Sequence, residues 1–209
     1  MTDRARHVPY FSQWASRELT SDVLTRGAAA ALAEDPQWAS SGAKTMDEYV
    51  QWASNLCGMA CLKMILAARA GREIPMPELA RKCTEYGGYS VNAAGQIKGL
   101  IYAPFVTFVR ETFRIDAEVV TGISACGLAG VLRQAEFFIA SVHHSIRWPE
   151  RQPPMKGGHL VLVLEATSDH VVFHNPSGHT VSSQDYAAVP VSTFDKFFAG
   201  RGVAIRAQA

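Results

Sequence analysis

The sequence predicts an α+β domain in which a helical half precedes an antiparallel β-sheet. Apolar residues at helical spacing fill most of the chain up to residue 135, and short strand-like runs follow them. Residues 57–70 are apolar nearly all round, which is typical of a helix at the centre of a domain. Helices first and strands second favour segregated layers over alternating βαβ units.

The first third of the chain contains the most varied segments. Residues 7–14 should be extended, because Pro9 cannot continue a helix and restricts the residue before it. Residues 18–32 are rich in alanine with helical spacing of apolar side chains, and residues 46–52 form a second short helix. Residues 17–50 are therefore expected to be a helical insertion ahead of the central helix.

After the central helix, which Gly71 should end, the pattern predicts three more helices. They cover residues 77–86, residues 96–113 with a kink or boundary at Pro104, and residues 124–135. The predicted strands are 117–120, 137–142, 159–165, 170–175 and 203–206, with a short helix near 193–198. Strand 159–165 is apolar on both faces and should be central in the sheet.

Length and charge exclude several classes of protein. A chain of 209 residues suits one domain over 1–209. The 20 Lys and Arg residues balance 19 Asp and Glu residues without clustering, so no basic field exists to bind nucleic acid. No apolar run approaches the roughly 20 residues that span a bilayer, and the N-terminus lacks a signal-type block. We expect a cytoplasmic protein with no membrane partner, and its oligomeric state stays open.

The cysteines favour neither a disulfide framework nor a metal site. Cys57, Cys61, Cys83 and Cys126 are too few and too irregularly spaced for a disulfide scaffold, so they should be reduced thiols. Cys57 and Cys61 stand four apart on one helix, and no second pair of ligands matches them. We expect no metal and no cofactor.

Cys57 is the candidate nucleophile. It lies in the first turn of the central helix, just after Ser54 and Asn55, which are candidate N-caps. Unpaired backbone N–H groups and the positive end of the helix should lower the pKa of its thiol toward the thiolate form. The alternative is a buried cysteine that only fills space.

A nucleophilic cysteine needs a base and a third group that orients the base. His159 opens the central strand and should be held rigidly, although it could be a structural histidine. If residues 166–169 form the turn of a hairpin, Asn175 comes within a diagonal of His159. Asp169 would then lie at the far end of that hairpin, roughly 20 Å away. Asn175 is therefore the expected orienter, and His174 should face the opposite side as a surface or packing residue.

Two glutamines are candidates for the side chain that donates a hydrogen bond in an oxyanion hole. Gln51 stands six residues before Cys57, and Gln13 lies in the extended N-terminal segment. Spacing favours Gln51, and either glutamine could be an ordinary surface amide.

Three sequence blocks carry a family resemblance. Cys-Gly-x-Ala-Cys-Leu-x-Met-Ile-Leu begins at Cys57, Gly-His-Leu-Val-Leu-Val surrounds His159, and Asn175 is followed by proline. Together they resemble the papain-like cysteine peptidases of clan CA, and most of all peptidase family thirty-nine, which trims double-glycine leaders from bacteriocin precursors. The opening residues 8–13 are similar to stand-alone members. The resemblance implies a papain-like fold.

The same resemblance assigns roles to residues of this chain. Cys57 would be the nucleophile, His159 the base and Asn175 the orienter, although the family's third residue is commonly aspartate. The insertion before Cys57 means that the family's glutamine corresponds to either Gln13 or Gln51.

The expected activity is hydrolysis of a peptide or amide through a Cys-His-Asn triad and an acyl-enzyme. An acyltransferase or amide-forming enzyme of a biosynthetic pathway would use the same acyl-enzyme, and the cleft walls decide whether it meets water or an amine. A non-catalytic peptide-binding module that retains the fold is a further alternative.

Overall fold

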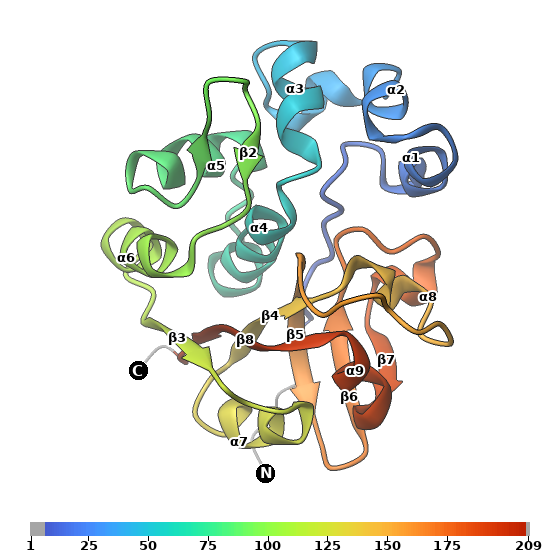
Figure 1. The fold of residues 1–209 in the computed structure, drawn as a ribbon. Helices are drawn as coiled ribbons and strands as arrows, with labels where there is room; N and C mark the ends of the chain where they lie inside the picture. The colour runs from blue at the N-terminus through green and yellow to red at the C-terminus, as the bar shows by residue number, and fades with distance from the viewer. Residues whose placement is uncertain (1–6, 208–209) are drawn as a thin grey trace.

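A computed structural model, which describes residues 7–207, shows a helical half above a six-stranded antiparallel sheet (Figure 1). The predicted α+β class is confirmed. The central helix α4 lies between the two halves, and its N-terminal end approaches the sheet at strand β5 (Figure 1). The terminal residues 1–6 and 208–209, which the predicted domain and the signal-peptide argument include, lie outside the described residues.

The helical half contains six α-helices and a small hairpin. The helices are α1 (Thr20–Arg26), α2 (Ala28–Ala33), α3 (Met46–Ala53), α4 (Cys57–Ala70), α5 (Met76–Glu85) and α6 (Tyr102–Phe113). Short 3₁₀ turns cover Arg17–Leu19 and Trp38–Ser41, and the hairpin consists of β1 (Ser90–Val91) and β2 (Ile97–Lys98).

Two of the predicted helices were wrong in detail. The predicted helix 18–32 is broken at Gly27, whose φ of 85° lies in the left-handed region that glycine adopts without strain. The predicted helix 96–113 begins only at Tyr102, because Ile97 and Lys98 pair in the β1–β2 hairpin. Pro104 falls in the first turn of α6, where its missing N–H needs no partner, so it produces neither a kink nor a boundary.

The central helix has the predicted bounds, and Gly71 ends it with a φ of 61°. Its N-cap is the buried Leu56, and no side chain in residues 7–207 caps the helix. The predicted caps Ser54 and Asn55 were therefore wrong. The backbone turns earlier than their spacing suggested, since the N–H of Asn55 donates to the Trp52 carbonyl at the end of α3.

The six-stranded sheet has the order β3-β8-β4-β5-β6-β7, and all neighbours are antiparallel. Strand β5 lies between β4 and β6, as its apolar sequence predicted. The strands are β3 (Ala117–Thr121), β4 (Phe137–Val142), β5 (His159–Ala166), β6 (His170–His174), β7 (Ala187–Pro190) and β8 (Phe198–Ile205).

Side chains alternate across β5 and fill two apolar cores. Leu160 and Leu162 pack in the core that contains α4, whereas Val161 and Val163 pack in the core on the other face of the sheet. That second face is covered by α7 (Leu128–Leu132) and α9 (Val191–Phe197) (Figure 1).

Some elements of the second half were missed or shortened in the sequence prediction. The helix expected over 124–135 is a 3₁₀ turn, Ala125–Gly127, followed by the short α7. Helix α8 (Val181–Gln184) and edge strand β7 were not predicted, and the strand expected over 203–206 is longer. Pro190 at the end of β7 fits an edge strand, where a missing N–H is tolerated.

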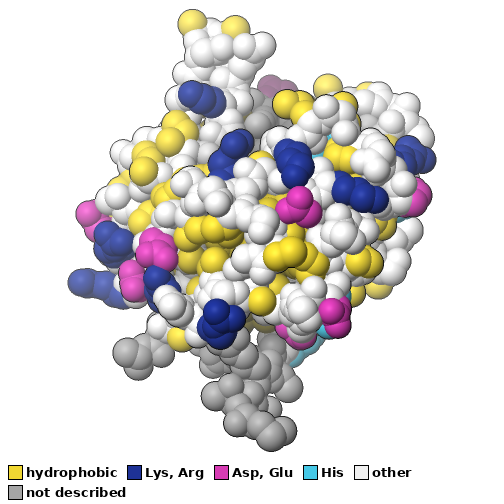
Figure 2. Space-filling model, turned by 60° about the horizontal axis from the view of Figure 1, so that its bottom comes forward, with side chains coloured by type: hydrophobic (Ala, Val, Ile, Leu, Met, Phe, Trp, Pro, Cys, Tyr) yellow, Lys and Arg dark blue, Asp and Glu magenta, His cyan; other side chains and the backbone are white. Residues whose placement is uncertain are grey.

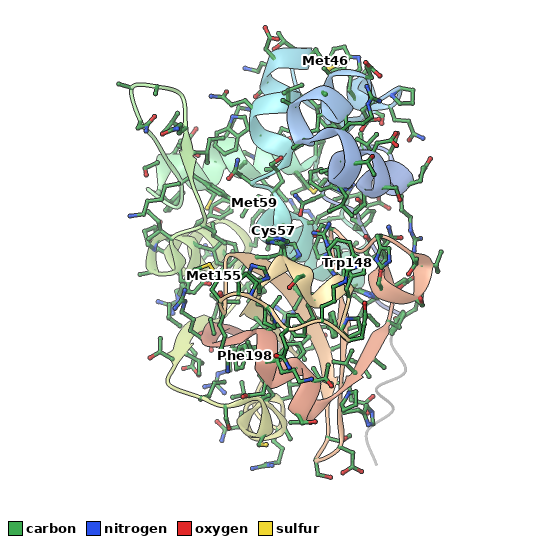
Figure 3. The ribbon with its side chains drawn as sticks, turned by 45° about the vertical axis from the view of Figure 1, so that its right-hand side comes forward. Met46, Cys57, Met59, Trp148, Met155 and Phe198 are labelled. Carbon is green, nitrogen blue, oxygen red and sulfur yellow. The ribbon has the colours of Figure 1, made fainter. Side chains whose placement is uncertain are left out.

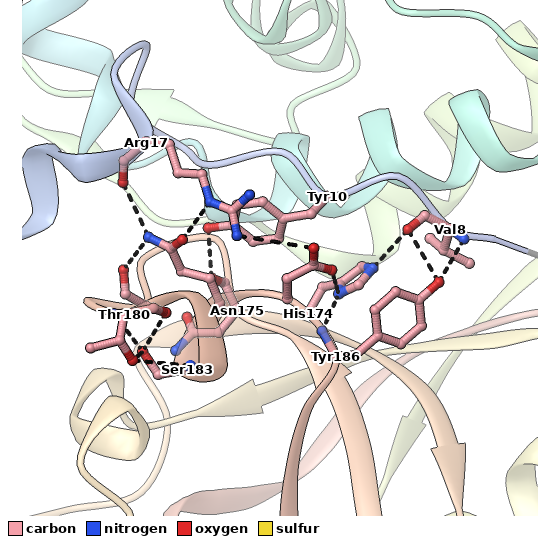
Figure 4. Close-up of polar contacts among 11 residues, drawn as sticks. Val8, Tyr10, Arg17, His174, Asn175, Thr180, Ser183 and Tyr186 are labelled. Atoms are coloured by element: carbon pink, nitrogen blue, oxygen red, sulfur yellow. Dashed lines mark hydrogen bonds and ion pairs between the residues drawn. The ribbon is translucent and has the colours of Figure 1, made fainter.

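The N-terminal segment 7–16 contains no helix or strand and runs between the helical half and strand β6 (Figures 1 and 4). The backbone of Val8 is held from both sides: its N–H donates to the Tyr186 hydroxyl at 2.9 Å and its carbonyl accepts from His174 Nε2 at 2.9 Å. Further along, the Tyr10 hydroxyl donates to the carbonyl of Asn175 at 3.1 Å.

The surface carries both signs of charge. On the face shown in Figure 2, Lys and Arg side chains are interspersed with Asp and Glu side chains and with apolar ones. Within residues 7–207, no helix is both long enough and apolar enough to cross a membrane.

Candidate active site

Cys57 is the first residue of α4 and lies where the helical half meets the sheet (Figure 3). The backbone N–H groups of Leu160, Gly58 and Cys57 itself are directed at its thiol. A Cβ at position 58 would lie 3.1 Å from Leu160 and 2.7 Å from Leu100, so glycine allows α4 to approach β5 this closely. The Cys-Gly pair thus places the thiol beside the backbone that follows His159.

The protonation state of the thiol differs from the sequence prediction. Burial raises the pKa of Cys57 to about 11, and the three N–H groups offset this rise only in part. The predicted lowering of its pKa was therefore wrong. The helix terminus acts on a half-buried thiol, and the raised pKa favours its neutral form at neutral pH.

His159 and Asn175 form the contact that the hairpin argument predicted. The Nε2 atom of His159 lies 2.9 Å from Oδ1 of Asn175, and both side chains are buried. The backbone N–H of Ser177 donates to the same Asn175 atom at 3.1 Å, which identifies that atom as the carbonyl oxygen. Nε2 of His159 therefore carries the proton, and Nδ1 is left as an acceptor.

The register of the hairpin is shifted slightly from the expected one. Leu162 pairs with His174 and Ala166 with Val171, with an irregularity between Val163 and Glu165. The expected turn at residues 166–169 places His159 opposite Pro176. Extending the observed inner pairing places it opposite Ser177, one residue further along, and Ser177 Oγ lies 3.2 Å from His159 Nε2. The turn lies one residue later than expected, because Ala166 still pairs with Val171, and the irregularity between Val163 and Glu165 moves the inner pairing back by one residue.

His159 is neutral at rest. Burial lowers its pKa to about 3, the hydrogen bond to Asn175 opposes the shift, and Arg147 adds to it. Within residues 7–207, no hydrogen bond joins the Cys57 thiol to the His159 ring, and the two are linked through the Leu160 backbone. Contacts of this kind are often loose without substrate.

Asp169 lies in the exposed turn at the far end of the β5–β6 hairpin. Its carboxylate accepts a hydrogen bond from Ser168 at 3.0 Å, and its backbone carbonyl accepts from Val191. His174, on the opposite face from Asn175, is fully buried and packs against the N-terminal segment. It is a packing residue and not a surface one.

The two glutamine candidates lie in different environments. Gln13 is 3% exposed, its Nε2 donates to the carbonyl of Ala53 at 3.0 Å, and its backbone N–H donates to Pro176 at 2.9 Å. Gln51 lies on the exposed side of α3, and its amide donates to the carbonyl of Gly95 at 2.9 Å. The structure brings Gln13, and not Gln51, to the loop that follows Asn175.

Sequence reasoning missed two polar residues next to the imidazole. Arg147 is buried, and its Nη2 donates to Ser177 Oγ at 2.8 Å while its Nε donates to the carbonyl of His144 at 2.9 Å. Ser177 in turn contacts His159. The only sequence signal is the run of prolines and glycines in residues 143–158, which is typical of a loop and includes Arg147.

The arrangement offers a thiol, a neutral imidazole with a free acceptor nitrogen, and two buried amides. Oε1 of Gln13 and Nδ2 of Asn175 are buried and have no hydrogen-bond partner among the residues that the structure describes. All four cysteines are free thiols. Among residues 7–207, no group of three or more His, Cys, Asp or Glu side chains is arranged to hold a metal ion.

Two solved structures resemble this one. The peptidase domain of Streptococcus ComA, a bi-functional ABC transporter involved in a quorum-sensing pathway, matches with a TM-score of 0.50 and 14% identity over 74% of this chain and 93% of that domain. A protein from Bacillus anthracis described as a C39-like peptidase matches with a TM-score of 0.50 and 14% identity over 74% of this chain and 90% of its own. No family model and no curated protein matches the chain. The chain therefore has the α+β fold of C39 peptidase domains, as the resemblance in sequence implied.

Proposed function

We propose that this protein is a papain-like thiol hydrolase that cleaves a peptide or amide bond with Cys57, His159 and Asn175. The observation that carries the proposal is the hydrogen bond of 2.9 Å from His159 Nε2 to Asn175 Oδ1. It fixes the imidazole tautomer in which Nδ1 can accept a proton. A helix N-terminus holds the thiol beside that strand, and the C39 peptidase fold supports a peptide as substrate.

In the first step, Nδ1 of His159 accepts the proton of the Cys57 thiol as the sulfur attacks the substrate carbonyl carbon. In this step the proton passes from a neutral thiol to a neutral imidazole as the S–C bond forms, so neither group is charged beforehand. Negative charge then develops on the carbonyl oxygen. The backbone N–H of Cys57 and the second amide hydrogen of Gln13 Nε2 are the proposed donors to it.

In the second step, the C–N bond breaks, and Nδ1 of His159 returns the proton to the leaving amine. The acyl group remains on Cys57 as a thioester. A water molecule, deprotonated by Nδ1, then attacks the thioester and releases the acid. Asn175 keeps the ring in one orientation through both steps and is therefore a positioning residue.

The test uses quenched fluorescent peptide libraries with mass spectrometry of the products. The wild-type protein should cleave peptides and yield acids, whereas Cys57→Ala should lose turnover while its circular dichroism spectrum is unchanged. Cys126→Ala, which alters an exposed cysteine, is the matched control and should retain full turnover. Substantial cleavage by Cys57→Ala would remove this residue from the mechanism, and products joined to an added amine would identify acyl transfer instead.

A further inference from the structure

The imidazole of His159 contacts two oxygen atoms that lie on the same tight turn. Its Nε2 atom lies 2.9 Å from Oδ1 of Asn175 and 3.2 Å from Oγ of Ser177. All three side chains are buried. The second contact joins the ring to a residue outside the proposed Cys-His-Asn triad.

The turn itself fixes both oxygen atoms. Residues 175–178 read Asn-Pro-Ser-Gly, which is typical of a type I β-turn. The N–H of Gly178 donates to the carbonyl of Asn175 at 3.1 Å, and the N–H of Ser177 donates to Oδ1 of Asn175 at 3.1 Å. A Cβ at position 178 would lie 2.3 Å from the carbonyl oxygen of Ser183, so glycine allows the turn to pack this closely. The turn therefore holds its two oxygen atoms at defined positions beside the imidazole.

The Ser177 hydroxyl is an acceptor toward the ring. Nε2 of His159 carries the proton that it donates to Oδ1 of Asn175, so a second oxygen at this nitrogen can only accept. A serine hydroxyl has two lone pairs, and Nη2 of Arg147 donates to one of them at 2.8 Å. The other lone pair is left for Nε2–H, which is therefore shared between Asn175 and Ser177.

Arg147 fixes the Ser177 hydroxyl from beyond Nε2. The residue is 5% exposed, and its Nε donates to the carbonyl of His144 at 2.9 Å within the 3₁₀ turn His144–Arg147. A planar guanidinium that is bonded through both Nε and Nη2 has little freedom to rotate. The hydroxyl that it contacts is held in turn, with its remaining lone pair available to the imidazole.

The charge of Arg147 also acts on the ring. Burial lowers the pKa of Arg147 to about 10, so the guanidinium is still charged at neutral pH. Its acceptors, the Ser177 hydroxyl and the His144 carbonyl, are neutral. Burial is the main cause of the low pKa of His159, the hydrogen bond to Asn175 opposes it, and the charge of Arg147 adds to it.

The other titratable groups around the ring and its partners are neutral at neutral pH. Burial lowers the pKa of the two histidines among them and raises the pKa of the thiol and of the phenol. These groups are His143 and His144 from the loop after β4, Cys57 on α4, and Tyr10 of the N-terminal segment. Arg147 therefore supplies the positive charge that acts on the imidazole.

We infer that Ser177, held by Arg147, is a second positioning residue for His159 and shares the imidazole N–H with Asn175. Either oxygen can then keep Nδ1 of the ring as the acceptor for the thiol proton. The positive charge behind Nε2 disfavours an imidazolium at rest. It also makes the imidazolium that forms during the reaction a stronger acid, which favours return of the proton to the leaving amine. The inference rests on the proposed function, because the catalytic role of His159 is itself proposed.

The first experiment is a double-mutant cycle on kcat. Ser177→Ala removes the hydroxyl but keeps the backbone N–H that donates to Asn175. Ser177→Ala and Asn175→Ala should each lower kcat by about 10-fold. The double variant should lose more than the product of the two losses, because a single variant retains one acceptor for the ring.

Ser141→Ala is the matched control for this cycle. Ser141 is 2% exposed, as Ser177 is, and it makes no hydrogen bond to the His159 ring among the described residues, so turnover should be unchanged. Circular dichroism and urea midpoints verify that each variant is folded. Wild-type turnover in Ser177→Ala, or single losses that simply multiply in the double variant, would overturn the inference.

The second experiment measures the pH profile of kcat/KM. Arg147→Met should move the acidic limb to higher pH by about 1 unit, because loss of a neighbouring cation raises the pKa of His159 and a protonated imidazole cannot accept the thiol proton. Arg147→Lys keeps the charge and should keep the limb close to its wild-type position. Arg151→Met, which removes a cation whose side chain is 63% exposed, should not move the limb. A rate loss in Arg147→Met without a shift of the limb would overturn the role of the charge, since it indicates structural support only.

The third experiment does not depend on turnover. ¹⁵N NMR spectra, in which His159 is identified by comparison with His159→Gln, report the imidazole tautomer. The Nε2–H tautomer should persist in Ser177→Ala and in Asn175→Ala and be lost in the double variant, and Arg147→Met should protonate the ring about 1 pH unit higher than the wild-type protein.

The NMR result separates this inference from the proposed hydrolysis. If the spectra follow the expectation while no peptide is cleaved, the positioning of His159 stands and the hydrolase proposal fails. If the double variant still shows the Nε2–H tautomer alone, the shared contact is overturned, and the hydrolase proposal then depends on Cys57→Ala.

Discussion

The backbone N–H of Gln13 donates a hydrogen bond of 2.9 Å to the carbonyl of Pro176, the residue that follows Asn175. The Ser12 hydroxyl donates to the same carbonyl at 3.2 Å, and the Tyr10 hydroxyl donates to the carbonyl of Asn175 at 3.1 Å. The N-terminal segment and the loop after β6 therefore form one unit. The proposed site residues Gln13 and Asn175, which are far apart in the sequence, are therefore held together by hydrogen bonds to backbone carbonyls.

The oxyanion donor can be assigned by a pair of matched substitutions. Gln13→Ala should lower kcat by about 10²- to 10³-fold, because it removes the buried amide that is the proposed oxyanion donor. Gln51→Ala should change kcat little, since that side chain is exposed and bonded to Gly95. Steady-state kinetics of the two variants check this, and a greater loss in Gln51→Ala would reverse the assignment.

Asn175→Ala should lower kcat while leaving the Cys57 thiol open to alkylation, because the imidazole loses its orienting partner but the helix N-terminus is unchanged. Asp169→Ala is the control, and it should be nearly silent because its carboxylate lies in the exposed hairpin turn. Turnover and alkylation rates are measured side by side. If Asp169→Ala reduced turnover as strongly as Asn175→Ala, the orienter assignment would not stand.

Asp35 is expected to hold the N-terminal segment against the helical insertion. Although burial opposes it, hydrogen bonds from the side chains of Ser16 and Tyr49 lower the pKa of Asp35. The backbone N–H groups of Ser16 and Gln37 also donate to this carboxylate, at 3.1 and 2.9 Å. Asp35→Ala leaves buried donors without an acceptor and should reduce the free energy of unfolding by at least about 2 kcal/mol.

Urea unfolding measures the effect of Asp35→Ala, with Asp22→Ala on the exposed side of α1 as the control, expected within about 0.5 kcal/mol of the wild-type protein. Turnover should fall in parallel with the loss of order around Gln13. An unchanged unfolding midpoint in Asp35→Ala would mean that the insertion is anchored elsewhere.

The pH dependence of thiol labelling tests the resting protonation state. Because burial raises the pKa of Cys57 to about 11, its thiolate fraction and its iodoacetamide labelling rate should rise about tenfold per pH unit up to that value. The measurement uses Cys126→Ser, which removes the exposed thiol. A labelling rate that is already high and constant from pH 6 upward would instead show a thiolate–imidazolium pair.

Acid should destabilise the fold through His159. The unfolded chain binds a proton at this residue near pH 6.5, whereas the folded protein binds it only near pH 3. Between these values the unfolded state holds more protons, so the free energy of unfolding should decrease as the pH falls. His159→Gln, which stays neutral and can still donate to Asn175, should show a weaker decrease between about pH 7 and about pH 4.5 in urea titrations. Equal decreases in both proteins would contradict the lowered pKa of His159.

The sequence alone determined the class of the fold and the two strongest candidate residues. Cys57 opens an apolar helix, and His159 opens a strand that is apolar on both faces, because the periodicity of burial is a local property of the chain. The contact with Asn175 was also predictable, since a short hairpin fixes which residues lie opposite each other, and the inner pairing differs from the expected one by only one residue.

Only the tertiary structure distinguishes the environments of Gln13 and Gln51, because these depend on hydrogen bonds between segments far apart in the chain. The same holds for the raised pKa of Cys57. A helix N-terminus can be read from local sequence, but the burial that outweighs it arises from β5 and its neighbours packing over the thiol. The position of Arg147 was also unpredictable from the sequence, because its hydrogen bond to Ser177 joins two loops that no local pattern brings together. Desolvation and long-range contacts exist only once the chain has packed.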